Sequence, residues 1–156
     1  SQFMPRLIEQ LAECGVALVV CPHFPKTKAH GATFKLREDK VVLMMTIRGS
    51  WADMFWFSFF HELGHIIHHS LREIILDNSK LDGREKEADQ FASDLLIPPK
   101  HYQPFVDKKQ FTQASVKGFA HQIDIHPGIV VGRLQHDGHL EKNRLNRLRE
   151  LYQWEQ

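Results

Sequence analysis

The 156-residue chain has few cysteines and no excess of charge of either sign. Cys14 and Cys21 lack the C-x-x-C spacing of metal and redox motifs and the density of a secreted disulfide scaffold. We therefore expect buried free thiols in a cytoplasmic protein. Because 20 Lys and Arg residues oppose 19 Asp and Glu residues, the net charge of +1 gives no overall attraction to nucleic acid or to an anionic membrane.

The sequence also lacks a hydrophobic run long enough to cross a membrane, and it shows no signal peptide. Its longest apolar run, residues 51–60, has about half of the ~20 residues that a spanning helix needs, and His61 and Glu62 follow it at once. With 42% hydrophobic residues, a chain of this length fits one globular domain over residues 1–156. Because the first Met is residue 4, we expect this domain to be a fragment of a longer protein.

Hydrophobic periodicity predicts an α+β fold with a small antiparallel sheet of three strands. Apolar residues at helical spacing predict an opening helix from Met4 to Cys14, which Gly15 ends. Strands are expected on both sides of the polar turn at residues 38–40 and before it, at residues 16–20, 31–36 and 41–47. Later helices are expected from Trp51 onward, at residues 83–96, 115–123 and 127–135, and helical spacing continues from Leu140.

The helix that begins at Trp51 is the central element of the prediction. Ser50 can cap it, and Asp53 complements the positive end of its dipole. Its first turns are apolar on every side, which predicts burial of nearly all its faces. Gly64 costs a helix interior roughly 1 kcal/mol relative to Ala. Either a strand or a substrate backbone approaches this glycine closely, or the glycine is simply tolerated.

Residues 61–65 of this helix read HELGH. His61 and His65 project from one helix face because residues i and i+4 lie one turn apart. Two imidazoles at this spacing can bind one Zn2+ ion, and Glu62 between them can act as the general base of a metallopeptidase. The alternative is two core histidines hydrogen-bonded to Glu62, but placing these groups in so apolar a helix is costly without an ion.

A catalytic zinc usually has three protein ligands and one open position, so a third ligand is required. The metzincin spacing would need a histidine at position 71, which is Leu71. His69 continues the row of His61 and His65, but three ligands in one row span about 12 Å along the helix and cannot close around one ion. We therefore expect the third ligand on another element, with His69 at a polar helix end.

The helix expected from Gly83, capped by Asp82, supplies that ligand. Its apolar stripe contains Ala88, Phe91, Ala92, Leu95 and Leu96. Glu85 projects near this stripe, whereas Glu87 falls on the solvent side. Asp89 lies one turn after Glu85 and can accept a hydrogen bond from a ligand histidine. Glu85 is thus predicted as the third ligand, the alternative being that both acids are surface charges of an amphipathic helix.

These motifs resemble the ImmA/IrrE family of small zinc metallopeptidases. They are FFHELGH at residues 59–65 and EKEADQFASDLLIP at residues 85–98, with a strand pair before them and PGIVVGRLQ at residues 127–135 after them. The resemblance implies a zincin-like helical core, the same three ligands and Glu62 as general base. It also implies a protein substrate, either a helix-turn-helix repressor or a toxin-antitoxin component. The WADMFWFSFFHELGH pattern is most similar to the branch that is fused to an upstream antitoxin-type DNA-binding domain.

A peptidase of this kind also gains from a hydrogen-bond donor aimed at the developing oxyanion. We favour His126, because a loop at the start of a helix can face a cleft. The other candidates on the later helices are His101, Tyr102, His121 and Arg133.

The competing interpretation is a regulatory or binding domain whose metal is structural or whose active site is idle. Residues 115–135 could then form a helix-turn-helix, but its second helix has one Arg and no Lys, so we expect no direct binding of nucleic acid. Arg144, Arg147 and Arg149 alternate with acidic residues, which predicts a solvated helix face. A fourth protein ligand would favour a structural zinc, and an open position would favour an enzyme.

Overall fold

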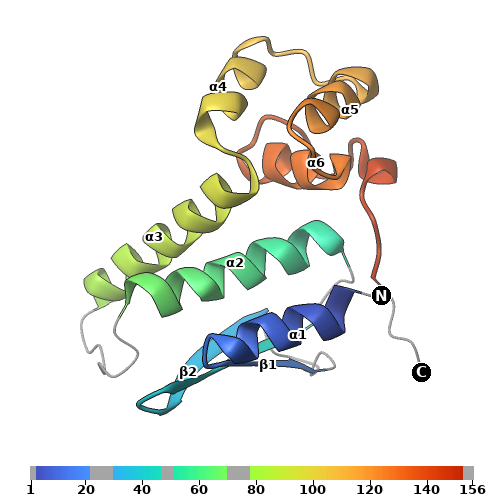
Figure 1. Ribbon diagram of the computed structural model, residues 1–156. Coiled ribbons are helices and arrows are strands. Elements are labelled where there is room, and N and C mark those ends of the chain that lie inside the picture. The colour runs from blue at the N-terminus through green and yellow to red at the C-terminus, as the bar shows by residue number, and fades with distance from the viewer. Residues whose placement is uncertain (1–2, 22–29, 47–50, 70–77, 153–156) are drawn as a thin grey trace. The chain divides into compact units, whose positions relative to one another are not determined.

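The computed structural model describes residues 3–21, 30–46, 51–69 and 78–152 (Figure 1). They form the following elements, in chain order: α1 (Phe3–Glu13), β1 (Val16–Cys21), β2 (Gly31–Arg37), β3 (Lys40–Thr46), α2 (Ala52–His68), α3 (Asn78–Leu96), α4 (Pro99–Asp107), α5 (Gln113–Gln122), α6 (Pro127–His136) and the short 3-10 helix η1 (Asn146–Leu148). Helices make up most of these elements and the three strands form a small sheet, so the predicted α+β class is confirmed.

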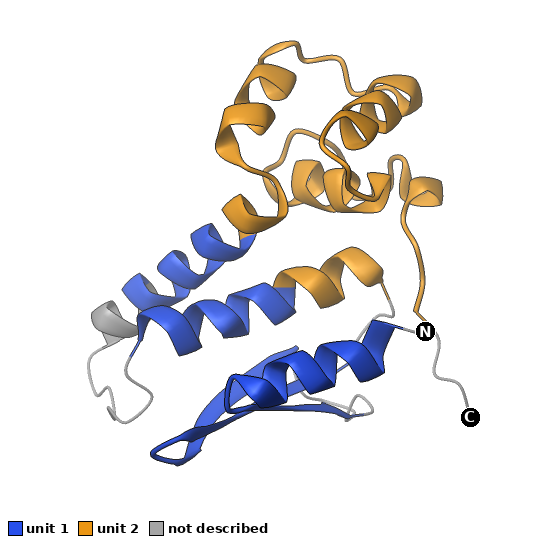
Figure 2. Cartoon of the chain, viewed as in Figure 1, with its two compact units in different colours: residues 1–48, 58–92 blue, residues 49–57, 93–156 orange. Residues whose placement is uncertain are grey.

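The chain divides into two compact units (Figure 2). The first contains residues 1–48 and 58–92, and the second contains residues 49–57 and 93–156. Helices α2 and α3 each contribute residues to both units. A single functional domain over residues 1–156 stays a prediction.

The three-stranded sheet of the first unit is mixed rather than antiparallel throughout. Its order is β1-β3-β2, with β2 antiparallel to β3 as expected but β1 parallel to β3, in a register that pairs Val16 with Val41. Residues 22–39 connect β1 to β3 and include β2. This connection has the length that a parallel crossover needs, so the expectation of three antiparallel strands was wrong.

Gly15 joins α1 to the sheet in a conformation that suits glycine. Its φ of +77° is in the left-handed region, and a Cβ atom there would lie 2.6 Å from the carbonyl oxygen of Asp39. Its own carbonyl accepts a hydrogen bond from the Val41 N–H at 3.0 Å. The predicted helix end at Gly15 is therefore confirmed, and the same residue starts the β1–β3 pairing.

One face of the sheet is buried and the other is partly exposed. Leu43 and Met45 of the central strand β3 are fully buried. Val19 and Phe34, which point to the opposite face, are 41% and 44% exposed. The buried face is the one that carries Thr33, since Thr33 pairs with Leu43.

The second unit has its own core, built by α4, α5, α6 and the chain that follows them. Its buried apolar residues include Phe105 and Phe119, whose rings stack at 4.1 Å. Helix α4 was not predicted because Pro98 and Pro99 were interpreted only as a stop signal. Pro99 in fact occupies the first turn of α4, a position where proline loses no hydrogen bond.

Within the second unit, the first turn of α2 contacts the segment around Arg149. Asp53 and Arg149, 8% and 9% exposed, form a bidentate pair with distances of 3.0 Å and 2.9 Å. Arg149 also lies over the Trp51 ring. The prediction that Arg149 belongs to a solvated helix face was therefore wrong, because a buried carboxylate pairs with it. Between residues 140 and 152 the only helical segment is η1, and Ser50 lies outside the described residues.

Three further expectations on burial need correction. Cys14 is exposed and Cys21 is half-buried, although both thiols are free. Leu95, expected on the inner stripe of α3, is 51% exposed. In α2, Phe55 and Phe59 are buried, but the other aromatic side chains of its first turns are only half-buried. Among the residues that the structure describes, no helix has the length and apolar character of a membrane span.

Candidate metal centre

Helices α2 and α3 approach each other closely at Gly64. A Cβ atom at this glycine would lie 3.2 Å from Cα of Ala88 and 3.2 Å from Cδ1 of Phe91. Ala88 is fully buried, so two small residues form the contact. The close approach of a neighbouring helix therefore explains the glycine within HELGH, an explanation that was not among the expectations.

Helix α3 also begins earlier than expected, at Asn78 rather than Gly83. Asp82 is therefore inside the helix and is not its N-cap, as had been predicted. The longer helix carries Glu85, Glu87 and Asp89 in its interior, where their backbone is fixed by helical hydrogen bonds.

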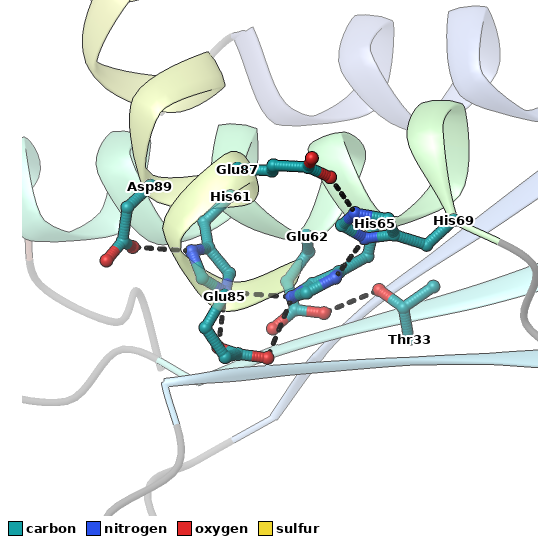
Figure 3. A network of polar contacts seen from close by, with 8 residues as sticks. All are labelled: Thr33, His61, Glu62, His65, His69, Glu85, Glu87 and Asp89. Atoms are coloured by element: carbon teal, nitrogen blue, oxygen red, sulfur yellow. Dashed lines mark hydrogen bonds and ion pairs between the residues drawn. The ribbon is translucent and has the colours of Figure 1, made fainter. Parts of the chain in front are cut away.

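Three potential ligands converge between α2 and α3: the imidazoles of His61 and His65 and the carboxylate of Glu85 (Figure 3). Nε2 of His61 lies 3.2 Å from Oε2 of Glu85, and Nε2 of His65 lies 3.3 Å from Oε1. The two Nε2 atoms are 3.0 Å apart. Ligand atoms bound tetrahedrally at ~2.1 Å lie about 3.4 Å from one another, so this spacing fits a single metal ion.

A hydrogen bond behind His61 determines which of its nitrogens faces the other ligands. Nδ1 of His61 lies 2.8 Å from Oδ1 of Asp89. Because a carboxylate only accepts hydrogen bonds, Nδ1 carries the proton, and Nε2 of the neutral ring presents a lone pair toward His65 and Glu85. Lone pairs and a carboxylate that face one another repel unless a proton or a metal ion lies between them. The donor set thus fits a metal ion, with Asp89 in contact with His61 on the far side of the ring.

A second histidine, which was not predicted as part of the site, lies behind His65. Nδ1 of His65 is 2.9 Å from Nδ1 of His69, and Nε2 of His69 is 2.9 Å from Oε2 of Glu87. Burial lowers the pKa of His65, which favours the neutral ring that a metal ligand must have. The available signal was the i,i+4 spacing of the two histidines.

Glu62 lies between α2 and the edge strand β2. Its Oε2 accepts a hydrogen bond of 2.6 Å from Oγ1 of Thr33, and a Cβ atom at Gly31 would lie 2.7 Å from its Cγ. Burial raises the pKa of Glu62, although the Thr33 hydrogen bond and the neighbouring His61 offset part of the effect. A carboxylate with a raised pKa is a more effective proton acceptor near neutral pH.

Gly31 and Thr33 were predicted only as strand residues. No local pattern in the sequence signals their proximity to Glu62, because it depends on which strand forms the edge of the sheet. A residue larger than glycine at position 31 would meet the Glu62 side chain. Both residues therefore shape the surroundings of the glutamate.

The structure brings His61, Glu62, His65, Glu85 and Asp89 together in the first unit. His126 belongs to the second unit, where its Nδ1 accepts a hydrogen bond from the Gly128 N–H and caps α6. Its assignment as an oxyanion donor stays a prediction. Another candidate from the same unit, Arg133, pairs with Asp137 at 2.7 Å and lies over the Tyr102 ring.

Comparison with known proteins adds one finding to this geometry. Residues 51–123 match the model of a peptidase family described as the IrrE N-terminal-like domain. Residues 51–123, just under half of the chain, therefore correspond to an ImmA/IrrE-family domain. The matched segment contains all of α2 and α3, and with them His61, His65, Glu85 and Asp89. No curated protein matches the chain.

The ImmA/IrrE domain is metallopeptidase-like, and a peptidase of that class requires a metal. In the described part of the chain, the group formed by His61, His65 and Glu85 is positioned to bind one. The family match rests on sequence, and the convergence of the three ligands is its geometric counterpart.

Proposed function

We propose that the chain is a zinc-dependent endopeptidase in which His61, His65 and Glu85 hold the metal and Glu62 is the general base. The observation that carries this proposal is the convergence of three ligand groups beside a buried glutamate. Two imidazole nitrogens and one carboxylate form the donor set of a catalytic zinc site that leaves a position open. No fourth protein ligand is found near the three among the described residues.

A zinc ion held by these residues would polarise a peptide carbonyl and lower the pKa of a water molecule. Glu62 accepts the proton of the attacking water and then donates it to the nitrogen of the leaving amine, while the peptide C–N bond breaks and a C–O bond forms. Thr33 holds Oε2 of Glu62, so that Oε1 is the oxygen left for the proton transfer. Asp89 orients the His61 ring.

The position of β2 supports a peptide substrate. Within the described sheet, β2 pairs with β3 alone, so its other edge carries backbone groups that an extended peptide can bind. Thr33 of this strand contacts Glu62. A peptide that adds to the edge of β2 would therefore bring a backbone carbonyl beside the general base.

The ImmA/IrrE family suggests the identity of the substrate. We propose a transcriptional repressor or a toxin-antitoxin component, in a protein that also carries an antitoxin-type DNA-binding domain. The test is incubation of the protein with the repressor or toxin-antitoxin protein encoded beside its gene, with mass spectrometry of the fragments. Wild type should cut the substrate and Glu62→Gln should not, while both hold equal amounts of zinc. Glu9→Gln, which changes an exposed glutamate of α1, should cut like wild type.

A second candidate is a latent or regulatory domain that retains the metal but does not cut. The observation that favours it is the burial of Glu62, which is 8% exposed and hydrogen-bonded to Thr33. In that case wild type and Glu62→Gln would both bind zinc, and neither would release fragments. Cleavage by Glu62→Gln at the wild-type rate would instead remove Glu62 from the mechanism.

A further inference from the structure

The two histidines of the site are supported in different ways. His61 is hydrogen-bonded directly to a carboxylate, Asp89. His65 reaches a carboxylate, Glu87, only through the ring of His69 (Figure 3). The side chain of His69 is 6% exposed, whereas that of Glu87 is 69% exposed. A nearly buried imidazole thus connects a site residue to an acid at the surface.

The positions of the protons on His69 and His65 follow from Glu87, which is the hydrogen-bond acceptor at the end of this connection. A carboxylate only accepts, so Nε2 of His69 donates to Glu87. In a neutral His69 ring, Nδ1 is then an acceptor, and it takes the hydrogen bond from Nδ1–H of His65. Nε2 of His65 is left with its lone pair directed at His61 and Glu85.

We propose that His69 and Glu87 are positioning residues that hold His65 in the tautomer and orientation of a metal ligand. This inference rests on the proposed metal site and deepens it. His69 cannot be a ligand in this arrangement, because both of its ring nitrogens are engaged, one with His65 and one with Glu87. Hydrogen bonds of this kind behind a ligand histidine fix its ring, and their loss typically weakens metal binding 10- to 100-fold.

A purely structural role for His69 is the alternative. Its backbone N–H bonds the carbonyl of His65, and a buried ring also fills space at the end of α2. These contributions would be retained by a side chain of similar size without hydrogen-bonding groups. The proposed role instead needs one atom that accepts from His65 and another that donates to Glu87, which glutamine can provide but leucine cannot.

The experiment measures zinc affinity by competition with a chromophoric chelator, and the visible spectrum of the Co2+ form, for wild type and four variants. His69→Leu should bind zinc at least 10-fold more weakly, with an altered Co2+ spectrum. His69→Gln should recover most of the affinity, and Glu87→Gln should lie between. His68→Ala is the matched control, since it removes the exposed neighbouring imidazole and should bind like wild type. Far-UV circular dichroism of each metal-free variant verifies folding.

NMR of 15N-labelled histidine in the zinc-loaded wild type gives a second measurement that does not depend on variants. His69 should appear as a neutral ring with its proton on Nε2. A proton on Nδ1 of His69, or equal affinities for His69→Leu and His69→Gln, would overturn the inference while leaving the metal site intact. If zinc does not bind to wild type, or if His61→Ala binds it equally well, the proposed function itself fails.

Discussion

Gly64 of α2 and Ala88 of α3 lie so close together that a methyl group on Gly64 would come within 3.2 Å of Cα of Ala88. This small-residue contact brings the acidic flank of α3 to the two histidines of α2. The residue that appears least suited to a helix interior is thus the one that allows the candidate metal site to assemble.

We expect Gly64→Ala to loosen this contact. The higher helix propensity of alanine contributes about 1 kcal/mol, but overpacking against backbone atoms of Ala88 costs about 1–3 kcal/mol, so the net change is a loss of about 1 kcal/mol. Urea unfolding of the metal-free protein measures it. Gly118→Ala is the control, because no atom lies within 4 Å of the added methyl group. Equal stabilisation by both changes would show that the helices do not meet at Gly64.

A second prediction concerns Asp89. Removal of its hydrogen bond with His61 should leave the ring free to rotate, and metal affinity should fall about 10-fold in Asp89→Asn and up to about 100-fold in Asp89→Ala. Isothermal titration with Zn2+ measures the change. Asp39→Asn removes the same charge from an exposed turn of the same unit and should bind normally. Normal binding by Asp89→Ala would contradict the role of this aspartate.

The ion pair between Asp53 and Arg149 provides a stability prediction. Asp53→Ala leaves a guanidinium that is 9% exposed without its partner, which should cost about 3–5 kcal/mol of unfolding free energy. Asp107→Ala, at an exposed position of α4, should cost less than about 1 kcal/mol. Chemical denaturation compares the two. Equal destabilisation by Asp53→Ala and Asp107→Ala would contradict this account of the ion pair.

Asp137 gives a prediction on pH. Burial pushes the pKa of its carboxyl upward, but hydrogen bonds from Arg133, His136 and Tyr102 outweigh burial and lower the pKa. A lowered pKa stabilises the fold above the unfolded value of about 3.9, and the stabilisation disappears as pH falls through the folded pKa. Asp137→Asn should therefore lower the free energy of unfolding by about 1 kcal/mol at pH 7, and by progressively less as pH falls through the pKa of the folded protein. Thermal unfolding across pH 2–7 tests this, and a constant difference would contradict it.

Local patterns predicted much of the fold because they depend on residues near one another in sequence. Proline after α3, glycine after α1 and the apolar run of α2 each signalled an element that the structure contains. The parallel pairing of β1 with β3 and the burial of Arg149 by Asp53 were missed. Both depend on contacts between distant residues, which no periodicity records. Helix α4 was missed because proline can either end a helix or begin one.

The candidate site shows the same division. The angle of Glu85 around α3 predicted that it faces α2, and the structure places it beside His61 and His65. The same projection placed Glu87 on the solvent side of the helix, and its side chain is exposed. However, a backbone projection does not include the reach of a long side chain toward His69. Thr33 lies in a strand, and its contact with Glu62 follows from sheet order alone.

The most direct test of the account is the zinc content of the purified protein, measured by mass spectrometry of the metal. We expect about one equivalent in wild type and in Glu62→Gln, and less than about a tenth of that in His61→Ala and in Glu85→Ala. Full zinc content in Glu85→Ala, or the absence of zinc from wild type after exposure to Zn2+, would contradict the claim that α2 and α3 together hold a metal ion.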